Sequence, residues 1–278
     1  MPAQQLTTRR VEKVWGRRDL GLGFGDVAEG GEPVGEIWFE GPPGVAPELL
    51  VKYLFTSEKL SVQVHPDDAA ARAAGYPRGK DEAWVVLAAE PDATIGIGMV
   101  EPMDRDELRA RALDGSIETK LDWKPVRRDD IFYSAAGTVH AIGPGVTLVE
   151  VQQNVDLTYR LYDYGRKREL HLDEGVAVSN PVPWVAPTRM RDAGGGRLIL
   201  VEGLKFVLER WRGEHAGALS PEAGRPIWLV PLAGEGTIDG VALEAGTAWI
   251  VAERASLDFD GDLLVAYSGA ESLRAPLG

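Results

Sequence analysis

The stretch Leu60-Ser61-Val62-Gln63-Val64-His65-Pro66 decides the fold, because polar and apolar residues alternate along it until a proline ends the run. Side chains two residues apart point to the same face of a β-strand. Ser61, Gln63 and His65 therefore share one face, and the intervening apolar residues share the other. A strand that carries a row of polar side chains opposite an apolar face predicts a β-barrel with a polar interior.

Runs of strand length and β-type composition continue on both sides of this stretch. They lie at residues 49–55, 84–87, 147–151, 198–201, 206–209, 227–231 and 248–251. The 33 glycines and 18 prolines are scattered along the whole chain and supply the turns between them. Many short strands joined by tight turns are typical of a β-sandwich or barrel.

Helical patterns are few, and we expect them only in the first half of the chain. Asp104 followed by Glu107 and by leucines and alanines predicts a capped helix that ends near Gly115. A short helix is expected over residues 67–74, before a glycine. Residues 117–123 are expected to extend the helical insert, which then covers about residues 104–123.

The length of 278 residues predicts either one large domain or one large domain together with a smaller one. We place a catalytic, metal-binding domain at residues 1–185 and a second, metal-free β domain at 186–278. A proline-rich connector at residues 181–187, followed by the glycines at 194–196, marks the division. The turn pattern of residues 232–249 resembles that of a degenerate second barrel.

Composition excludes several classes of protein. The chain has no cysteine, which rules out disulfides and thiolate metal sites. Its net charge of −13 argues against nucleic-acid binding, although clustered lysines and arginines can still attract a small anion. No stretch is long and apolar enough for a membrane span, and the N-terminus lacks the apolar core of a secretory signal. We expect a cytoplasmic monomer or homodimer.

Two further segments carry residue types that bind metals. Glu82 directly precedes the strand-like residues 83–86, and His140 follows the turn Ala136-Gly137-Thr138-Val139. Together with Gln63 and His65 they offer imidazole, carboxylate and amide ligands, a set that suits Zn²⁺, Fe²⁺, Mn²⁺, Co²⁺ or Ni²⁺. A single histidine is more often structural, but the joint pattern in a chain of four histidines favours a metal site. The remaining two are expected elsewhere, His171 at the surface or behind the ligands and His215 in a loop.

At this point four strings of the sequence resemble a known family, the type I mannose-6-phosphate isomerases in their short bacterial form. The strings are Leu60-Ser-Val-Gln-Val-His-Pro-Asp67, Gly79-Lys-Asp-Glu82, Ala136-Gly-Thr-Val-His-Ala141 and Asp156-Leu-Thr-Tyr-Arg160. The resemblance covers roughly residues 15–180. It implies a cupin-type β-barrel (jelly roll) with a small helical insert and a smaller, metal-free cupin-like domain. It also implies a zinc enzyme that interconverts mannose 6-phosphate and fructose 6-phosphate.

The resemblance assigns roles to individual residues. It implies one Zn²⁺ bound by Gln63, His65, Glu82 and His140. It further implies that the catalytic and substrate-binding residues are Ser61, Lys80, Glu150, Asp156 and Arg160. The sequence departs from the family in one place, because longer members carry a histidine in an H-K-P-E string where this chain has Gly79. A proton-transfer role for that histidine is therefore absent here or belongs to another group.

Several alternatives stay open from the residues alone. The catalytic base for an enediol-type isomerisation is Lys80, Asp156 or Glu150. Arg160 contacts substrate or else makes a surface salt bridge near Asp163, and Lys52 lies in the pocket or in solvent. Trp15, Trp38 and Trp84 are expected in the core.

The competing functions are an isomerase or epimerase for another sugar or sugar phosphate, a non-catalytic sugar-binding cupin, and another metal-dependent cupin enzyme such as an oxygenase.

Overall fold

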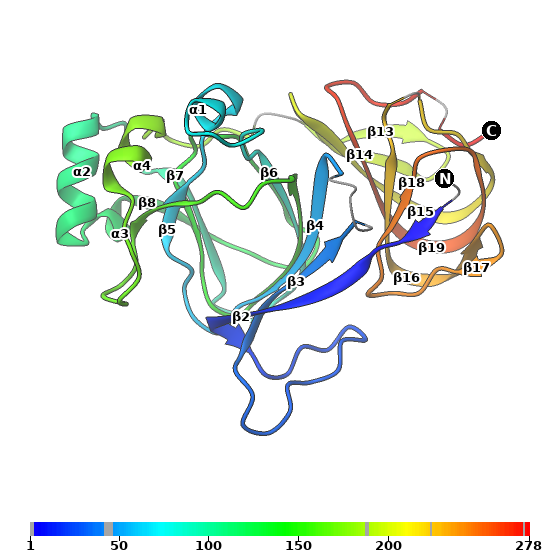
Figure 1. Ribbon diagram of the computed structural model, residues 1–278, viewed down its shortest axis with the longest axis horizontal. Coiled ribbons are helices and arrows are strands. Elements are labelled where there is room, and N and C mark those ends of the chain that lie inside the picture. Colours follow the sequence, from blue (N-terminus) through cyan, green and yellow to red (C-terminus); the bar gives the residue numbers. More distant parts are fainter. Residues whose placement is uncertain (1–2, 42–46, 187–188, 223, 275) are drawn as a thin grey trace.

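The chain forms two β-rich halves side by side, with both termini in the same half (Figure 1). The computed structural model describes residues 3–41, 47–186, 189–222, 224–274 and 276–278. Pro187, the last residue of the expected connector, lies outside these ranges. The strands far outnumber the helices, so the expected mainly β class is confirmed.

The first half consists of two antiparallel sheets. One has the strand order β2 (Thr7–Arg17), β3 (Val34–Glu40), β4 (Leu49–Phe55), β11 (Val146–Gln153), β6 (Glu82–Ala89) and β9 (Ile131–Ser134). The other has the order β12 (Tyr159–Tyr162), β5 (Val62–Val64), β10 (His140–Ile142), β7 (Thr94–Met99) and β8 (Leu121–Pro125). Within the described ranges, hydrogen bonding leaves these as separate sheets. One apolar core contains Trp84 and Leu148 of the first sheet and Ile95 and Ile142 of the second, which shows that the sheets pack face to face.

The centre of the six-stranded sheet is buried on both faces, which explains why all seven residues of β4 are buried. Lys52 and Leu54 point toward the five-stranded sheet, where they line a pocket. Val51 and Tyr53 point the other way and pack against Trp228 and other apolar residues of the C-terminal half. The same sheet therefore carries the site on one face and joins the two halves of the molecule with the other.

The C-terminal half is built on an eight-stranded antiparallel sheet. Its order is β1 (Gln4–Gln5), β18 (Trp249–Val251), β16 (Ile227–Ile238), β19 (Ala255–Ser268), β15 (Phe206–Leu219), β14 (Arg197–Glu202) and β13 (Arg191–Gly194), and β17 (Val241–Ala242) pairs with β16. A second apolar core, with Trp211, Phe259 and Tyr267 among its members, lies inside this half. The start of the chain belongs to this sheet, because Gln4 pairs with Ile250.

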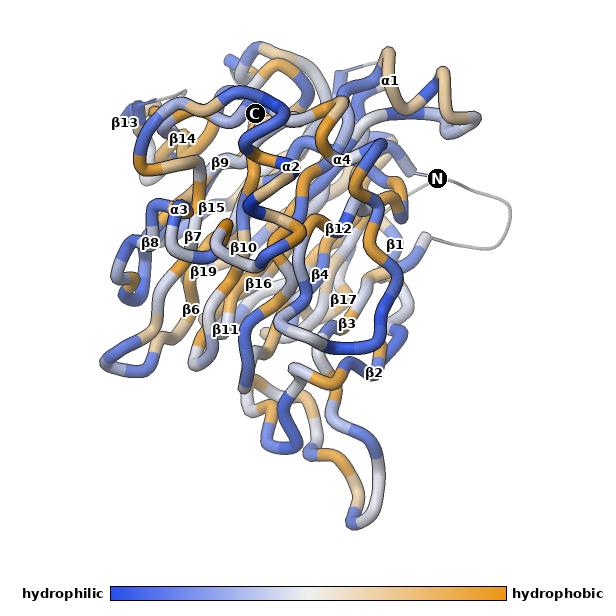
Figure 2. Tube along the Cα trace, turned by 90° about the vertical axis from the view of Figure 1, so that its left-hand side faces the viewer, coloured by the Kyte–Doolittle hydropathy of each residue, from blue (hydrophilic) through white to orange (hydrophobic). Residues whose placement is uncertain are grey.

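Two predicted helices are confirmed. Helix α1 (Asp68–Ala73) begins after Asp67, whose carboxylate accepts the Ala70 N–H at 2.8 Å. Helix α2 (Arg105–Asp114) is capped by Asp104 and ends at Gly115 in the left-handed conformation. Figure 2 shows both hydrophilic and hydrophobic residues along α2, as expected for a helix with one buried side.

Two helical expectations are wrong. Helix α3 (Ile117–Lys120) is one turn long, and residues 121–123 belong to strand β8 instead. Helix α4 (Leu172–Val178) lies in the second half of the chain, where no helix was expected. Its sequence contains valines and Gly175, which are weak helix formers, so packing decides its conformation. A Cβ atom at Gly175 would lie 2.7 Å from Leu161, which shows how tightly α4 packs on the five-stranded sheet. None of the helices in the described ranges could span a membrane.

Candidate active site and metal centre

Three of the predicted metal ligands converge between the two sheets of the first half. His140 begins β10 and lies opposite Gln63 of β5, while His65 directly follows β5. Glu82 comes from β6 of the facing sheet. One ligand atom each of His65, Glu82 and His140 lies within 4.8 Å of the others, and all three side chains are buried. This geometry suits a single metal ion.

Backbone carbonyls orient both imidazole rings. His65 Nδ1 lies 2.9 Å from the Leu157 carbonyl oxygen, and His140 Nδ1 lies 2.9 Å from the Thr138 carbonyl oxygen. A carbonyl oxygen only accepts, so each Nδ1 carries the proton and donates it. Each Nε2 therefore carries a lone pair, which lies within hydrogen-bond distance of Lys80 Nζ (3.4 Å) in His65 and of Gln63 Nε2 (3.2 Å) in His140. The two Nε2 atoms also lie 3.3 Å and 3.6 Å from Glu82. Such carbonyl partners are typical of histidines that bind metals.

The carboxylate of Glu82 provides a test of whether a cation fits. Both of its oxygens are buried and lack a hydrogen-bond partner, which is costly for a charged group. Lys80 Nζ lies 2.8 Å from Oε1, but at angles that do not form a hydrogen bond. A metal ion between Glu82 and the two imidazoles would satisfy these oxygens, so the residues fit a metal.

The charge states in this group also suit a metal. Burial opposes the charged form of Glu82, but the Lys80 ammonium and the two histidines outweigh it and hold its pKa well below the usual range. Burial lowers the pKa of His65 to about 3, and it lowers the pKa of His140 as well. At neutral pH the group therefore offers one carboxylate and two neutral imidazoles, which are the forms that bind metals.

Gln63 lies beside this group but presents its nitrogen rather than its oxygen. Its amide Nε2 lies 3.2 Å from His140 Nε2, and its Oε1 accepts the Ser61 hydroxyl at 3.2 Å. The amide would have to turn over for its oxygen to face the ion. Its role as a ligand therefore stays a prediction.

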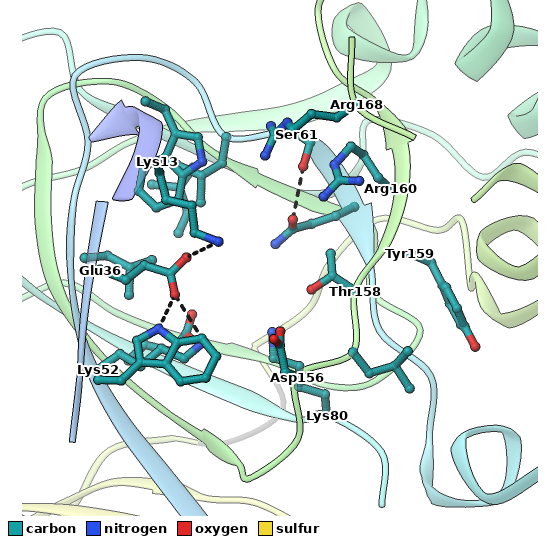
Figure 3. Close-up of a pocket in the computed structure, with 18 of the residues that line it drawn as sticks. Lys13, Glu36, Lys52, Ser61, Lys80, Asp156, Thr158, Tyr159, Arg160 and Arg168 are labelled. Carbon is teal, nitrogen blue, oxygen red and sulfur yellow. Dashed lines mark hydrogen bonds and ion pairs between the residues drawn. The ribbon is translucent and has the colours of Figure 1, made fainter. Parts of the chain in front are cut away.

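A pocket of about 340 Å³ opens above the metal group. All the other predicted site residues line it, namely Ser61, Lys80, Glu150, Asp156 and Arg160. Figure 3 shows Ser61, Arg160 and Arg168 on one side and Lys13, Glu36 and Lys52 on the opposite side, with Lys80 and Asp156 between them. Five cationic side chains line the pocket against three carboxylates, those of Glu36, Glu150 and Asp156. The pocket is therefore net positive within a negatively charged chain, which suits an anionic ligand.

One wall of the pocket is a row of side chains in register across four strands. Trp38 of β3 pairs with Lys52 of β4, which pairs with Glu150 of β11, which pairs with Trp84 of β6. Lys52 Nζ lies 3.1 Å from Glu150 and 3.6 Å from Glu36. The alternative that places Lys52 in solvent is therefore wrong, because the neighbouring sheet covers its side chain. The three tryptophans are buried as expected, and all three also line the pocket.

Burial and ion pairing set the charges along this row. Burial opposes the charged form of Lys52, but the carboxylates of Glu150 and Glu36 outweigh it and raise the pKa of Lys52. Burial and the nearby charge of Glu82 raise the pKa of Glu150, despite the attraction of Lys52. The pKa of Glu36 is lowered, because Lys52 and Lys13 together overcome the effect of burial. Two carboxylates around one ammonium thus differ in their affinity for a proton.

The alternative of a surface salt bridge for Arg160 is wrong. Its Nη1 donates to the carbonyl oxygen of Glu169 at 2.7 Å, and no carboxylate within the described ranges forms an ion pair with it. Asp163 instead accepts two hydrogen bonds from Arg168, each 2.6 Å long. The backbone N–H of Arg160 donates to His171 Nδ1 at 3.3 Å, and His171 also lines the pocket.

The backbone explains the departure from the family string at Gly79. A Cβ atom at this position would lie 2.4 Å from the carbonyl carbon of Asp67. Gly79 N also donates to Asp68 Oδ1 at 2.8 Å, which holds the segment against helix α1. A histidine therefore cannot occupy this position unless the backbone moves.

Sequence reasoning placed one histidine incorrectly and missed several pocket residues. His215 lies in strand β15 rather than in a loop, and its ring packs on Trp211 at a centroid distance of 5.0 Å. The pocket residues that were missed are Lys13, Glu36, Thr158 and Arg168. Strand alternation could have found Glu36, which is two residues from Trp38 and so shares its face. Arg168 follows a turn, where no periodic sequence pattern predicts which way a side chain points.

Comparisons with known proteins agree with this site. No family model matches the chain. A mannose-6-phosphate isomerase of Streptococcus mutans is 35% identical over 235 residues, which cover 79% of this chain and 73% of that protein. A probable mannose-6-phosphate isomerase of Bacillus subtilis is 29% identical over 226 residues, 74% of this chain and 71% of the relative. A crystal structure of a mannose 6-phosphate isomerase from Bacillus subtilis aligns with a TM-score of 0.79 at 25% identity, covering 96% of this chain and 99% of that one.

The fold and the His-Glu-His group define a cupin-type β protein whose pocket is suited to a metal ion and an anionic ligand. The likeness to the Streptococcus mutans protein extends over most of both chains. The chain belongs to the mannose-6-phosphate isomerase family. The resemblance found in the sequence strings is thereby confirmed.

Proposed function

We propose that this protein is an aldose–ketose isomerase that interconverts mannose 6-phosphate and fructose 6-phosphate with one bound Zn²⁺. The observation that carries the proposal is the buried group of His65, Glu82 and His140 beneath a pocket lined by lysines and arginines. Membership of the family supports the reaction, and the cationic pocket supports a phosphorylated substrate.

His65, Glu82 and His140 would hold the metal, with Gln63 as a fourth ligand once its amide has turned. A divalent ion in this place supplies a Lewis acid that stabilises negative charge developing on the oxygens of the sugar. The ligand set contains no sulfur and suits several divalent ions. We propose Zn²⁺ among them because the sequence resemblance implies it. Lys80, 2.8 Å from Glu82, would hold the carboxylate in place at the edge of the pocket.

Arg160, Arg168 and Ser61 would bind the phosphate group. They lie on one side of the pocket (Figure 3), and their guanidinium and hydroxyl groups donate hydrogen bonds of the kind that phosphate oxygens accept. Asp163 fixes the direction of Arg168 through two hydrogen bonds. With the phosphate anchored there, the opposite end of the sugar would reach the metal group and the row of Lys52 and Glu150.

Among the three candidate bases, the geometry favours Glu150. Its carboxylate faces the pocket, its pKa is raised, and a raised pKa brings a carboxylate closer to the working range of a general base. Lys80 is less suited because Glu82 lies within ion-pair distance of its ammonium, and Asp156 is exposed to solvent. Glu150 would take the proton from C2 and return it at C1, while Lys52 stabilises the carboxylate form.

A coupled assay of the purified protein tests this proposal. Turnover of mannose 6-phosphate is measured before and after treatment with a chelator, and again after Zn²⁺, Co²⁺ or Mn²⁺ is added back. We expect activity that is lost with the metal and restored by it. Free mannose and other aldose 6-phosphates serve as comparison substrates. A preference for one of these would replace the proposed substrate, and metal-loaded protein that turns over none of them would refute an isomerase.

A further inference from the structure

Asp81 lies between two residues of the site but points away from it. Lys80 lines the pocket and Glu82 belongs to the metal group, whereas the Asp81 side chain between them is directed toward Tyr133 and Ala136. Asp81 is 4% exposed, and its carboxylate accepts hydrogen bonds from the backbone N–H of Ala136 at 3.0 Å and from the hydroxyl of Tyr133. Both oxygens of this buried carboxylate therefore accept a hydrogen bond from the protein.

The partners of Asp81 belong to the segment that carries His140. Tyr133 lies in β9, and Ala136 lies in the turn between β9 and β10. The next residue of that turn, Gly137, donates its N–H to the carbonyl oxygen of His65 at 2.8 Å. The turn thus contacts the chain at Asp81 and at His65, and it leads directly into His140.

The backbone of Asp81 is fixed from the other side. Its N–H donates to Gln153 Oε1 at 3.1 Å, and its carbonyl oxygen accepts the Gln153 N–H at 3.1 Å. Gln153 Nε2 donates to Asp68 at 3.1 Å, and Lys205 of the C-terminal half lies 2.6 Å from the same carboxylate. A continuous polar network therefore runs from the C-terminal half to the segment that carries Lys80 and Glu82.

We propose that Asp81 is a positioning residue that joins the segment carrying Lys80 and Glu82 to the turn that leads into His140. It touches no reacting atom and acts through those three side chains. The inference rests on the proposed metal site. Ligands from two facing sheets keep their mutual distance only if something ties their backbones together, and the hydrogen bonds of Asp81 to Ala136 and Tyr133 do this directly behind the ligands.

Titration of the metal-free protein with Co²⁺ tests this role without any sugar substrate. Asp81→Asn keeps the shape of the side chain but removes its charge and one acceptor. We expect Co²⁺ affinity to fall about 10- to 100-fold, as for other groups that support metal ligands, and the visible absorption spectrum of the bound Co²⁺ to change. In the isomerase assay, kcat is expected to fall while KM stays within about threefold. The matched control is Asp130→Asn, because Asp130 also accepts a backbone N–H, that of Arg127 at 2.9 Å, but away from the site.

A second variant covers the case in which Asp81→Asn fails to fold. Tyr133→Phe removes one of the two donors and keeps the carboxylate, so the same pattern is expected with a smaller loss of Co²⁺ affinity. Asp81 would be an ordinary structural residue if thermal stability dropped while Co²⁺ affinity, the Co²⁺ spectrum and kcat matched those of Asp130→Asn. Unchanged Co²⁺ binding in Tyr133→Phe, with Asp81→Asn unfolded, would overturn the proposal equally. Absence of isomerase activity in the unmodified protein would refute the proposed function alone, since Co²⁺ binding is measured independently.

Discussion

The Nζ atom of Lys52 lies 3.1 Å from Oε1 of Glu150, and the two residues are direct cross-strand partners on β4 and β11. Both side chains are buried, and the indole N–H of Trp84 donates to the second oxygen of Glu150 at 3.1 Å. The stability of a charge pair this well shielded from water depends on both residues, because removing either one leaves an uncompensated buried charge that destabilises the fold.

Replacement of Lys52 by methionine is expected to impair both stability and turnover. The change leaves Glu150 and Glu36 buried without their shared ammonium, which typically costs about 3–5 kcal/mol. Chemical denaturation measures the loss, and the coupled assay measures turnover. The double variant Lys52→Met with Glu150→Gln also removes the charge of Glu150, while Lys13 remains 3.4 Å from Glu36, so it should recover much of the stability but none of the activity. Equal stability of the single and double variants would show that the pair is not coupled.

Replacement of His140 by alanine is expected to abolish metal retention while the protein stays folded. The change removes one of three ligands from a site that lies between two sheets with extensive cores of their own. Metal content after dialysis is measured by mass spectrometry, and folding by circular dichroism. His171→Ala is the control for metal content, because His171 lines the pocket but is not part of the metal group. Full metal content in His140→Ala would remove this residue from the ligand set.

Replacement of Arg160 by alanine is expected to leave the metal bound and to lower kcat/KM by about 100-fold or more. Hydrogen bonds between charged groups contribute about 1.5–3 kcal/mol each, and a guanidinium can make two to phosphate. Arg109→Ala is the matched control, since Arg109 pairs with Asp173 on the surface. Near-normal kinetics for Arg160→Ala would exclude Arg160 from substrate binding.

The free energy of unfolding of the metal-free protein is expected to decrease as the pH is lowered, because of His65. The unfolded chain takes up a proton on this residue near pH 6.5, whereas the folded chain does so only near pH 3. The contribution of the neutral, buried imidazole is therefore present above pH 6.5 and is lost as the pH falls toward 3. Relative to His65→Gln, the free energy of unfolding should decline by up to about 1.4 kcal/mol per pH unit below 6.5. Denaturant titrations of both proteins in chelator at several pH values measure this difference. Parallel curves would contradict the expected burial of a neutral His65.

Replacement of Gly79 by alanine is expected to destabilise the protein. The added methyl group would lie 2.4 Å from the backbone of Asp67, so the segment before Lys80 must shift. Overpacking of this kind typically costs about 1–3 kcal/mol. Gly25→Ala is the control, because the nearest atom to a methyl group there is 3.9 Å away. Denaturation midpoints compare the two, and equal midpoints would show that the backbone at Gly79 adapts freely.

The sequence predicted those parts of the site that depend on local periodicity. Alternation along residues 60–65 placed Ser61 and Gln63 in the pocket and His65 in the metal group, as the structure has them. The strand at residues 49–55 matches β4, because its largely apolar and aromatic composition agrees with its burial. Asp67 and Asp104 predicted where α1 and α2 begin, because an N-cap hydrogen bond joins residues only three positions apart in the sequence.

The remaining features depend on contacts between distant segments. Lys52 was ambiguous because β4 is buried on both faces, so no polar and apolar alternation shows which side faces the pocket. Helix α4 forms where Gly175 packs on Leu161, which is a tertiary contact. Asp81 carries no signal of its own in the sequence, because its partners Ala136 and Tyr133 lie more than fifty residues away. The division into domains at residues 185 and 186 stays a prediction.

The pairing of β1 with β18 has a consequence for the order in which the molecule can assemble. Gln4 is made long before its partner Ile250, because the strands β2 to β17 lie between them in the sequence. Strand β1 must therefore stay unpaired until β18 is made, by which time both sheets of the metal site have all their strands. Closing so long a loop carries an entropic cost that is met only once the rest of that sheet exists. Strand β1 can thus pair with its sheet only after every strand from β2 to β17 has been made.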